Sequence, residues 1–460
     1  MRAGPTWANG IVVAVWLGLI AAPAFAQVAT SPALFLETVR DPGSTDVPST
    51  ARSLALGGVR FGSGRADEAL ASPASLVLGI GSDVIVSGGP LLYARDELVS
   101  TPDRFPPRDA ARQRSASSRS FPVFAAFATR RGPWAVAGFY DVSASFDHSF
   151  DTATSNIYFA ALQGTFLSED GTGHSSVSQT VSRIGGAAAI GPSSHRAALG
   201  IAVSAVRLDY DVTAHVQVDG QSSAFGGPIA RFTAEHDNRV SFLGWGPAFV
   251  ISGTVRPVTP VIVAGRWEHN PEFSATRSIV IEERGQTVRD DNAVRFQPPS
   301  TYAIGVSVAV RRTVVAGEIA RTRFSMAFQP VLSTPGSDRC AIPQLYCPGW
   351  GIANYEPADA TTCRAGIEQT IPTTNGAFIV RGGTSVQGGY TVARPTSDPF
   401  RNGGSIPAPP FLSDYEPPRE QSTWITGGVA YAWRQYEVAF GAGRSQTQTR
   451  LLGDFRMRIP

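Results

Sequence analysis

Residues 51–76 read ARSLALGGVRFGSGRADEALASPASL, and this stretch decides the fold. It is rich in small residues and has no sustained period of helix or strand. Gly57, Gly58 and Gly62 permit tight backbone bends that a side chain would forbid. Pro73 fixes its own φ and biases Ser72 away from helix. We therefore expect a compact plug here, with the rest of the chain built around it.

The same stretch resembles the N-terminal signature of the FadL/TodX-type outer-membrane transporters of hydrophobic compounds. In that family a Gly-rich segment runs into an Asn-Pro-Ala motif. Gly57 and Gly58 match the glycines, Pro73 and Ala74 match the Pro-Ala, and Ser72 stands where the family usually has Asn. The resemblance implies an N-terminal hatch inside an antiparallel β-barrel of about fourteen strands. Similar openings also occur in PorV-like proteins.

The order of residues at 1–26 is that of a cleavable secretory signal. Arg2 precedes the apolar run at 11–20, and small residues at 24–26 follow it. The run is shorter than the ~20 residues that a membrane-spanning helix needs. We expect a signal peptide at 1–26, a hatch at 27–80, and a transmembrane barrel with long extracellular loops at 81–460.

The charge balance argues against an electrostatic partner. The chain has 39 basic and 37 acidic side chains, so loss of Arg2 with the signal changes 39 − 37 = +2 to 38 − 37 = +1. Nucleic acid would require a marked positive excess. We therefore expect no nucleic-acid partner.

Alternation of apolar and polar residues recurs after residue 80. In the segment from Tyr302 to Val310, every second residue is apolar and the residues between are small or polar. Such segments have the length of tilted membrane strands with an overhang, although a soluble β-sandwich also shows alternation. We predict strands at about 83–97, 119–130, 133–147, 174–190, 195–212, 238–255, 259–272, 299–311, 312–325, 361–371, 375–389, 420–433, 434–446 and 449–459.

The connections between these segments favour the membrane barrel. They alternate between long and very short, as expected of extracellular loops and periplasmic turns, and nothing in a soluble sandwich requires this. Aromatic residues that fit a girdle at headgroup depth lie beside the turns or near a loop: Trp134, Tyr302, Phe378, Tyr431, Trp433 and Tyr436. The sequence therefore predicts a multi-pass protein of the bacterial outer membrane.

Charged residues of the hatch leave two interpretations open. Arg60, Arg65 and Asp67, with Arg52 and Glu68, either hold a gate by ion pairs or are solvated in a polar lumen. The alternation also points Arg266 and Glu268 into the lumen. The resemblance places hatch or gating residues at Gly57, Gly58, Arg60, Arg65, Asp67, Ser72, Pro73 and Ala74.

No catalytic, cofactor-binding or metal-binding motif stands out. The six histidines lack ligand spacing, there is no Gly-x-Ser-x-Gly elbow, and no glycine loop for a dinucleotide. We expect neither an enzyme nor a cofactor or metal. Cys340 and Cys347 share a Pro/Gly-rich loop and could form a disulfide, which leaves Cys363 over.

The resemblance implies a monomer in outer-membrane lipid that takes up hydrophobic small molecules, such as long-chain fatty acids or aromatic hydrocarbons. The loops would capture the ligand and the hatch would gate its passage. Exit through the wall is placed at Gly138, because glycine in a strand often marks a kink; relief of crowding against the plug is the alternative. The competing function is a PorV-like structural or secretion-associated barrel that binds a protein partner.

Overall fold

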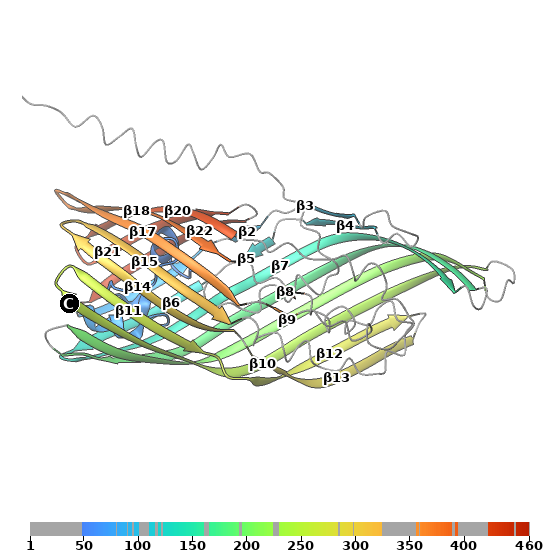
Figure 1. Ribbon diagram of the computed structural model, residues 1–460, viewed down its shortest axis with the longest axis horizontal. Coiled ribbons are helices and arrows are strands. Elements are labelled where there is room, and N and C mark those ends of the chain that lie inside the picture. Colours follow the sequence, from blue (N-terminus) through green and yellow to red (C-terminus); the bar gives the residue numbers. More distant parts are fainter. Residues whose placement is uncertain are drawn as a thin grey trace, which may run out of the picture.

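The computed structural model describes residues 48–79, 81–89, 91–93, 96–100, 110–115, 118–120, 123–160, 165–192, 196–223, 230–283, 286–297, 299–323, 356–357, 359–388, 392–393, 422–445 and 448–459. They form a closed antiparallel β-barrel of 14 strands, and residues 48–79 fold inside it (Figure 1). The predicted fold class, an all-β barrel with an N-terminal hatch, is confirmed. The predicted start of the hatch at residue 27 lies outside the described residues.

The barrel closes where its first and last strands pair. The ladder between β1 and β22 runs from Ser82 opposite Ile459 to Gly88 opposite Gly453. Each predicted segment overlaps one strand of the ring. In order, these strands are β1 (Ser82–Gly88), β6 (Val123–Arg131), β7 (Trp134–Ala160), β8 (Thr165–Ile190), β9 (Ala197–Ser223), β10 (Ala230–Val258), β11 (Val261–His269), β14 (Ser300–Val310), β15 (Thr313–Arg323), β17 (Ala360–Thr373), β18 (Gly376–Gln387), β20 (Ser422–Trp433), β21 (Tyr436–Arg444) and β22 (Gln448–Ile459).

Four strands run on beyond the others and form an extension of the sheet (Figure 1). β7, β8, β9 and β10 have 27, 26, 27 and 29 residues, whereas a tilted membrane strand needs only about 9–11. The hairpin of β12 (Phe273–Glu283) and β13 (Gln286–Phe296) adds to it, because β12 pairs with β10. Most of 148–173 and 213–237, expected as loops, is therefore paired strand. Its polar composition hid this, since backbone pairing in water needs no apolar face.

Shorter strands complete the sheet. β2 (Leu91–Tyr93) pairs with β5 (Ser118–Ser120) and with β22. β3 (Asp96–Ser100) pairs with β4 (Ala110–Ser115), which also meets β7. β16 (Glu356–Pro357) and β19 (Val392–Ala393) form a separate pair.

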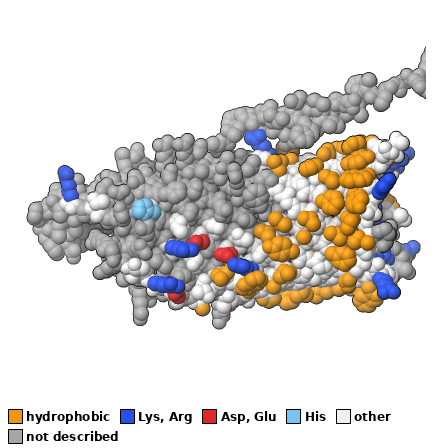
Figure 2. All heavy atoms as spheres, turned by 180° about the vertical axis from the view of Figure 1, so that it is seen from behind, with side chains coloured by type: hydrophobic (Ala, Val, Ile, Leu, Met, Phe, Trp, Pro, Cys, Tyr) orange, Lys and Arg blue, Asp and Glu red, His pale blue; other side chains and the backbone are white. Residues whose placement is uncertain are grey.

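The outer face of the ring carries an apolar band (Figure 2). Along β14, Val306 is 43% exposed on the outside, whereas its neighbour Ser307 is 5% exposed on the inside. The same alternation exposes Phe127, Ile184 and Ile304. A closed ladder with such a band satisfies its backbone internally and presents hydrocarbon outward, as immersion in lipid requires. No helix among the described residues is long and apolar enough to cross a membrane.

The hatch is built from short helical turns. α3 (Ala51–Ala55) begins with a capping box in which Ser53 N donates to Thr50 Oγ1 at 3.2 Å and Thr50 N donates to Ser53 Oγ at 3.3 Å. Two 3₁₀ turns follow, η1 (Ala66–Glu68) and η2 (Pro73–Leu78), and Pro73 occupies the first turn of η2, where its missing N–H is harmless.

Immersion of the apolar band in lipid can be tested by placing a charge at two depths along one strand. Val306 and Val310 share the outer face of β14, but Val310 lies at the turn. Val306→Arg should lower the free energy of unfolding by about 2–4 kcal/mol, and Val310→Arg by about 0–1 kcal/mol, because the cost of a charge falls toward the membrane interface. Equilibrium unfolding from lipid vesicles measures both. Equal losses would contradict immersion of the band.

Candidate functional site

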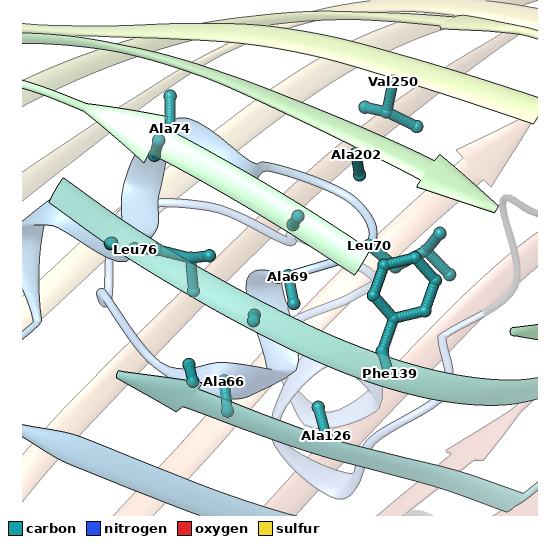
Figure 3. Packing of buried hydrophobic residues seen from close by; sticks show 14 of the residues in the cluster. Ala66, Ala69, Leu70, Ala74, Leu76, Ala126, Phe139, Ala202 and Val250 are labelled. Carbon is teal, nitrogen blue, oxygen red and sulfur yellow. The ribbon is translucent and has the colours of Figure 1, made fainter. Parts of the chain in front are cut away.

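The hatch packs one side against an alanine-rich wall (Figure 3). Its apolar residues include Ala66, Ala69, Leu70, Ala74 and Leu76, all buried. The facing positions on β6 to β10 are mostly small and come from successive strands: Ala126, Ala128, Ala135, Ala137, Ala187, Ala189, Ala198 and Ala202, with Phe124, Phe139 and Val250. These contacts are non-directional, so they favour burial without fixing one position along the wall.

The Pro-Ala pair of the hatch lies close to this wall. A Cβ at Gly200 of β9 would overlap the backbone of Pro73 and Ala74, so only glycine fits there. Ala74 N donates to Ser252 Oγ of β10 at 2.8 Å. Ser72, the family's Asn position, is buried and its hydroxyl pairs with that of Ser75 at 3.0 Å. This segment is therefore seated by close backbone contact.

Gly57 and Gly58 meet the opposite wall. Gly57 has φ +69°, and a Cβ there would overlap the carbonyl oxygens of Thr384 and Ala365. Its N–H donates to Thr426 Oγ1 at 3.1 Å. Gly58, at φ +93°, lies against the side chain of Arg364. The glycines that carried the resemblance thus allow the hatch to touch β17 and β18.

That opposite wall carries a chain of ion pairs. Arg381 of β18 binds Glu368 of β17 at 2.7 Å and Glu437 of β21 at 3.2 Å. Arg456 of β22 binds Glu437 at 3.4 Å and Asp83 of β1 at 2.7 Å. Charge therefore alternates in sign along this wall from β17 to β1, with uncharged β20 between β18 and β21.

The chain of charges continues on the next strands. Glu318 of β15 accepts from Arg364 of β17 and from Arg266 of β11, the latter at 3.3 Å. Arg183 of β8 reaches Glu268 of β11 at 3.0 Å. The predicted inward orientation of Arg266 and Glu268 is confirmed. We call the following residues the ion-pair belt: Asp83, Arg183, Arg266, Glu268, Glu318, Arg364, Glu368, Arg381, Glu437 and Arg456.

Two hatch arginines complete the belt. Arg52 lies 3.3 Å from Glu368, and Arg65 lies 3.0 Å from Glu437 and 3.6 Å from its own neighbour Asp67. Both arginines are more than nine-tenths buried. Of the two interpretations from sequence, these contacts match ion pairing; gating by them stays a prediction.

Backbone groups of the hatch also bind wall carboxylates. Ala51 N donates to Asp454 Oδ1 at 2.8 Å, and Ala66 N donates to Asp83 Oδ2 at 2.9 Å. Hydrogen bonds to charged groups are worth about 1.5–3 kcal/mol each. The hatch is therefore fixed by directional contacts on the side of β17 to β1.

Glu68 organises the hatch from within. It accepts hydrogen bonds from Ser63 N, Ser63 Oγ and Gly64 N at 2.7–3.1 Å, and its carboxylate lies 3.6 Å from Arg52. Burial raises the pKa of Glu68 above its usual value, and Arg52 opposes that shift. Glu68 thus holds the turn around Gly64 while linking it to Arg52.

A small cavity lies between this part of the hatch and Phe124. Its volume is about 20 Å³, roughly the space of one water molecule. Arg60, Asp67 and Glu68 line it together with Leu70. Arg60 is buried, and Asp141 of β7 is among its electrostatic neighbours.

Gly138 sits in a regular ladder. It faces Phe127 on β6 and Gly186 on β8, with nothing within 4 Å of a Cβ built on it. It points outward, so it does not relieve crowding against the hatch. The register shift of β7 falls between Val142 and Ala144. A lateral exit at Gly138 stays a prediction.

Two further sets of residues bear on the predicted chemistry. Cys340 and Cys347 lie outside the described residues, and Cys363 is free and exposed. Among the described side chains, no group of three His, Cys, Asp or Glu could hold a metal ion.

The fold has solved relatives. A Pseudomonas aeruginosa FadL homologue matches at TM-score 0.54 and 9% identity, over 89% of this chain and 97% of that chain. The CymD monoaromatic hydrocarbon channel matches at TM-score 0.50 and 12% identity, over 89% of this chain and 97% of that chain. The Ralstonia pickettii toluene transporter TbuX matches at TM-score 0.49 and 14% identity, over 91% of this chain and 100% of that chain. No protein-family model and no curated protein matches the chain. The predicted likeness to FadL-type barrels is confirmed at the level of fold.

The hatch contacts predict a local weakness in one variant. Arg65→Gln removes the charge that binds Glu437 but leaves Arg381 and Arg456 on that carboxylate. The free energy of local opening of residues 48–79 should fall by about 1.5–3 kcal/mol, which speeds amide hydrogen exchange there and spares the ring strands. Arg207→Gln, which removes an exposed pair with Asp209, is the control and should change little. Unchanged exchange in Arg65→Gln would show that the pair does not hold the hatch.

Proposed function

We propose that this protein is an outer-membrane transporter that takes up hydrophobic small molecules, with the hatch as its moving part. The observation that carries the proposal is the two-sided seat of residues 48–79. They fill the lumen, with apolar contacts on β6 to β10 and ion pairs on β17 to β1.

The outer membrane is the location that suits the barrel. An antiparallel ring with an outward apolar band satisfies every ladder hydrogen bond without lipid or water. Membrane barrels of bacteria have an even number of strands and short turns at one end, as here. The predicted signal peptide at residues 1–26 would direct export of the chain, which a protein of the outer membrane requires.

The side chains that line the barrel beside the hatch favour a hydrophobic cargo. Beside the hatch, the wall of β6 to β10 offers mostly alanine and phenylalanine, and its buried charges among the described residues are Asp141 and Arg183. A ligand gains about 0.8 kcal/mol for each CH₂ removed from water, so apolar compounds would gain from such a lining. The fold is shared with a FadL homologue and with a monoaromatic hydrocarbon channel, which supports long-chain fatty acids or aromatic hydrocarbons as the class.

Transport requires a second position of the hatch. The hatch is held on both walls of the barrel, and a ligand can shift only an equilibrium between states that already exist. Movement would break the pairs of Arg52 and Arg65 and the hydrogen bond of Ala74 N with Ser252 Oγ, while the alanine contacts shift along the wall. Loss of these pairs is compensated in part because Glu368 and Glu437 keep Arg381. We therefore assign the gating role to these arginines together with the flanking segments at Gly57, Gly58 and Pro73.

A PorV-like barrel that binds a protein partner is the second candidate. The observation that favours it is the extension of β7 to β10 with the hairpin β12–β13, which offers a broad sheet beyond the band (Figure 1). A partner-binding barrel would use this surface and would not need a movable hatch.

Tethering the hatch separates the two functions. A Cβ on Gly62 would lie 3.6 Å from Ser307 Cβ, within the range of disulfides. Gly62→Cys/Ser307→Cys, in a background with Cys340, Cys347 and Cys363 replaced by Ser, should lose uptake of a radiolabelled long-chain fatty acid or toluene when oxidised. Reduction should restore it.

The single variants control for the strain of a side chain at φ +89° on Gly62. They should transport whether oxidised or reduced. Normal uptake by the oxidised double variant would refute gating by the hatch. Absence of uptake by the untethered protein with every apolar solute tried, together with retained binding of a protein partner through the extension, would favour the second candidate.

A further inference from the structure

All but one of the short turns at one end of the barrel carry arginine, and the exception is the turn between β17 and β18. The strands of the ring alternate in direction, so the turns β6–β7, β8–β9, β10–β11, β14–β15 and β20–β21 and the end of β22 all lie at the same end. Each of them bears at least one arginine. We call these residues the arginine rim: Arg131, Arg196, Arg256, Arg311, Arg312, Arg434 and Arg458.

Neighbouring turns bring these side chains into one surface. Arg256 N donates to the carbonyl oxygen of Arg196 at 2.7 Å, and Arg458 N donates to that of Gln435, next to Arg434, at 2.8 Å. All but Arg256 are exposed. Figure 2 shows basic side chains at this free edge of the apolar band. The rim is therefore an edge of positive charge that only the β17–β18 turn interrupts among the described short turns.

The rim lacks the counter-charge found at the other end of the barrel. There, exposed Arg207, Arg239, Arg289 and Arg321 each pair with an aspartate. Among the described residues of the rim turns there is no exposed Asp or Glu, and the carboxylates nearby, Asp83 and Glu437, are buried on the inside of the barrel. A surface whose charge is left unbalanced by the protein attracts anions from outside.

Two rim arginines occupy backbone positions that suit glycine better. Arg311 and Arg434 have φ +56° and +50°, and no other non-glycine residue of the described chain has positive φ. Each is the first residue of a two-residue loop, between Val310 and Thr313 and between Trp433 and Tyr436. Glycine would be less strained there. The presence of arginine at a strained position is a reason to seek a role for its side chain.

The apolar band ends directly at the rim. Val310 is 60% exposed beside Arg311, Val255 is 52% exposed beside Arg256, and Ile459 is 38% exposed beside Arg458. The aromatic row of Phe378, Tyr431, Trp433, Tyr436 and Phe455, with ring centroids 4.8–6.0 Å apart, lies at the same end. Amphipathic rings of this kind sit at headgroup depth. The guanidinium groups of the rim are then at the depth of the lipid phosphates.

We propose that the arginine rim binds the phosphate groups of anionic phospholipids in the leaflet that surrounds the short turns. The planar guanidinium matches phosphate with two parallel hydrogen bonds. Unpaired arginines at this edge also select anionic over zwitterionic headgroups. The inference rests on the proposed function only for the placement of the apolar band in a membrane, and it is independent of hatch movement and of cargo.

Lipid selectivity of the folded barrel tests the proposal. The full mature chain in neutral detergent is titrated with phosphatidylglycerol, with phosphatidylcholine or with inorganic phosphate, and bound molecules are counted by native mass spectrometry. Phosphatidylglycerol should bind more tightly than phosphatidylcholine, and added salt should reduce the difference. Arg311→Gln/Arg312→Gln/Arg434→Gln/Arg458→Gln should lose this preference, by about fivefold for each arginine removed.

The matched control removes four arginines from the other end, Arg207→Gln/Arg239→Gln/Arg289→Gln/Arg321→Gln, and should keep the preference. Equal loss in both variants would overturn the proposal, because net charge alone would then explain binding. So would equal binding of the two lipids by the unaltered barrel, or full occupancy by inorganic phosphate alone. Binding of polyglutamate without lipid preference would instead assign the rim to an acidic protein partner. If the chain stays soluble without detergent, the placement of the apolar band in a membrane is wrong.

Discussion

Burial of charge inside the barrel is the constraint on which the arrangement of the hatch depends. An unpaired charge removed from water is costly, and loss of one partner of a buried pair costs about 3–5 kcal/mol. Arg52 and Arg65 are tolerated because Glu368 and Glu437 lie at the same depth on the facing wall. Those carboxylates are in turn shared with Arg381. The hatch therefore fits one height in the lumen, set by the ion-pair belt.

The two walls of the barrel hold the hatch by different kinds of contact. Contacts along β6 to β10 are mostly apolar, since most of the facing side chains are alanine, and the hydrogen bond from Ala74 N to Ser252 Oγ adds a directional one. Contacts along β17 to β1 are directional and depend on distance. Displacement of the hatch would thus break a few defined pairs, while the apolar side keeps much of its buried area. Because the shared carboxylates keep wall partners when the hatch arginines leave, the second state is not left with isolated buried charges.

Local signals were readable from the sequence, and long-range ones were not. Gly57, Gly58 and Pro73 indicated the plug, because the backbone freedom of glycine and the fixed φ of proline act within a few residues. Alternation located all the ring strands and oriented Arg266 and Glu268 inward. The partners of the hatch could not be found in this way, since Arg65 and Glu437 are 372 residues apart. Inward charges at equal depth on β17, β18, β21 and β22 were the signal that could have revealed the belt. The extension of β7 to β10 was missed because its ladder carries no apolar face to mark it.

Closure of the barrel by its first and last strands has a consequence for biogenesis. Ala51 binds Asp454, 403 residues away, and β1 completes its ladder only against β22. The hatch is thus made early, yet its seat exists only after the final strand has been placed. Joining such distant segments is slow, because loop-closure entropy must be overcome before the contacts form. During that interval the segment lacks its seat, and its glycine, serine, proline and charged residues disfavour the β-pairing that leads to aggregation.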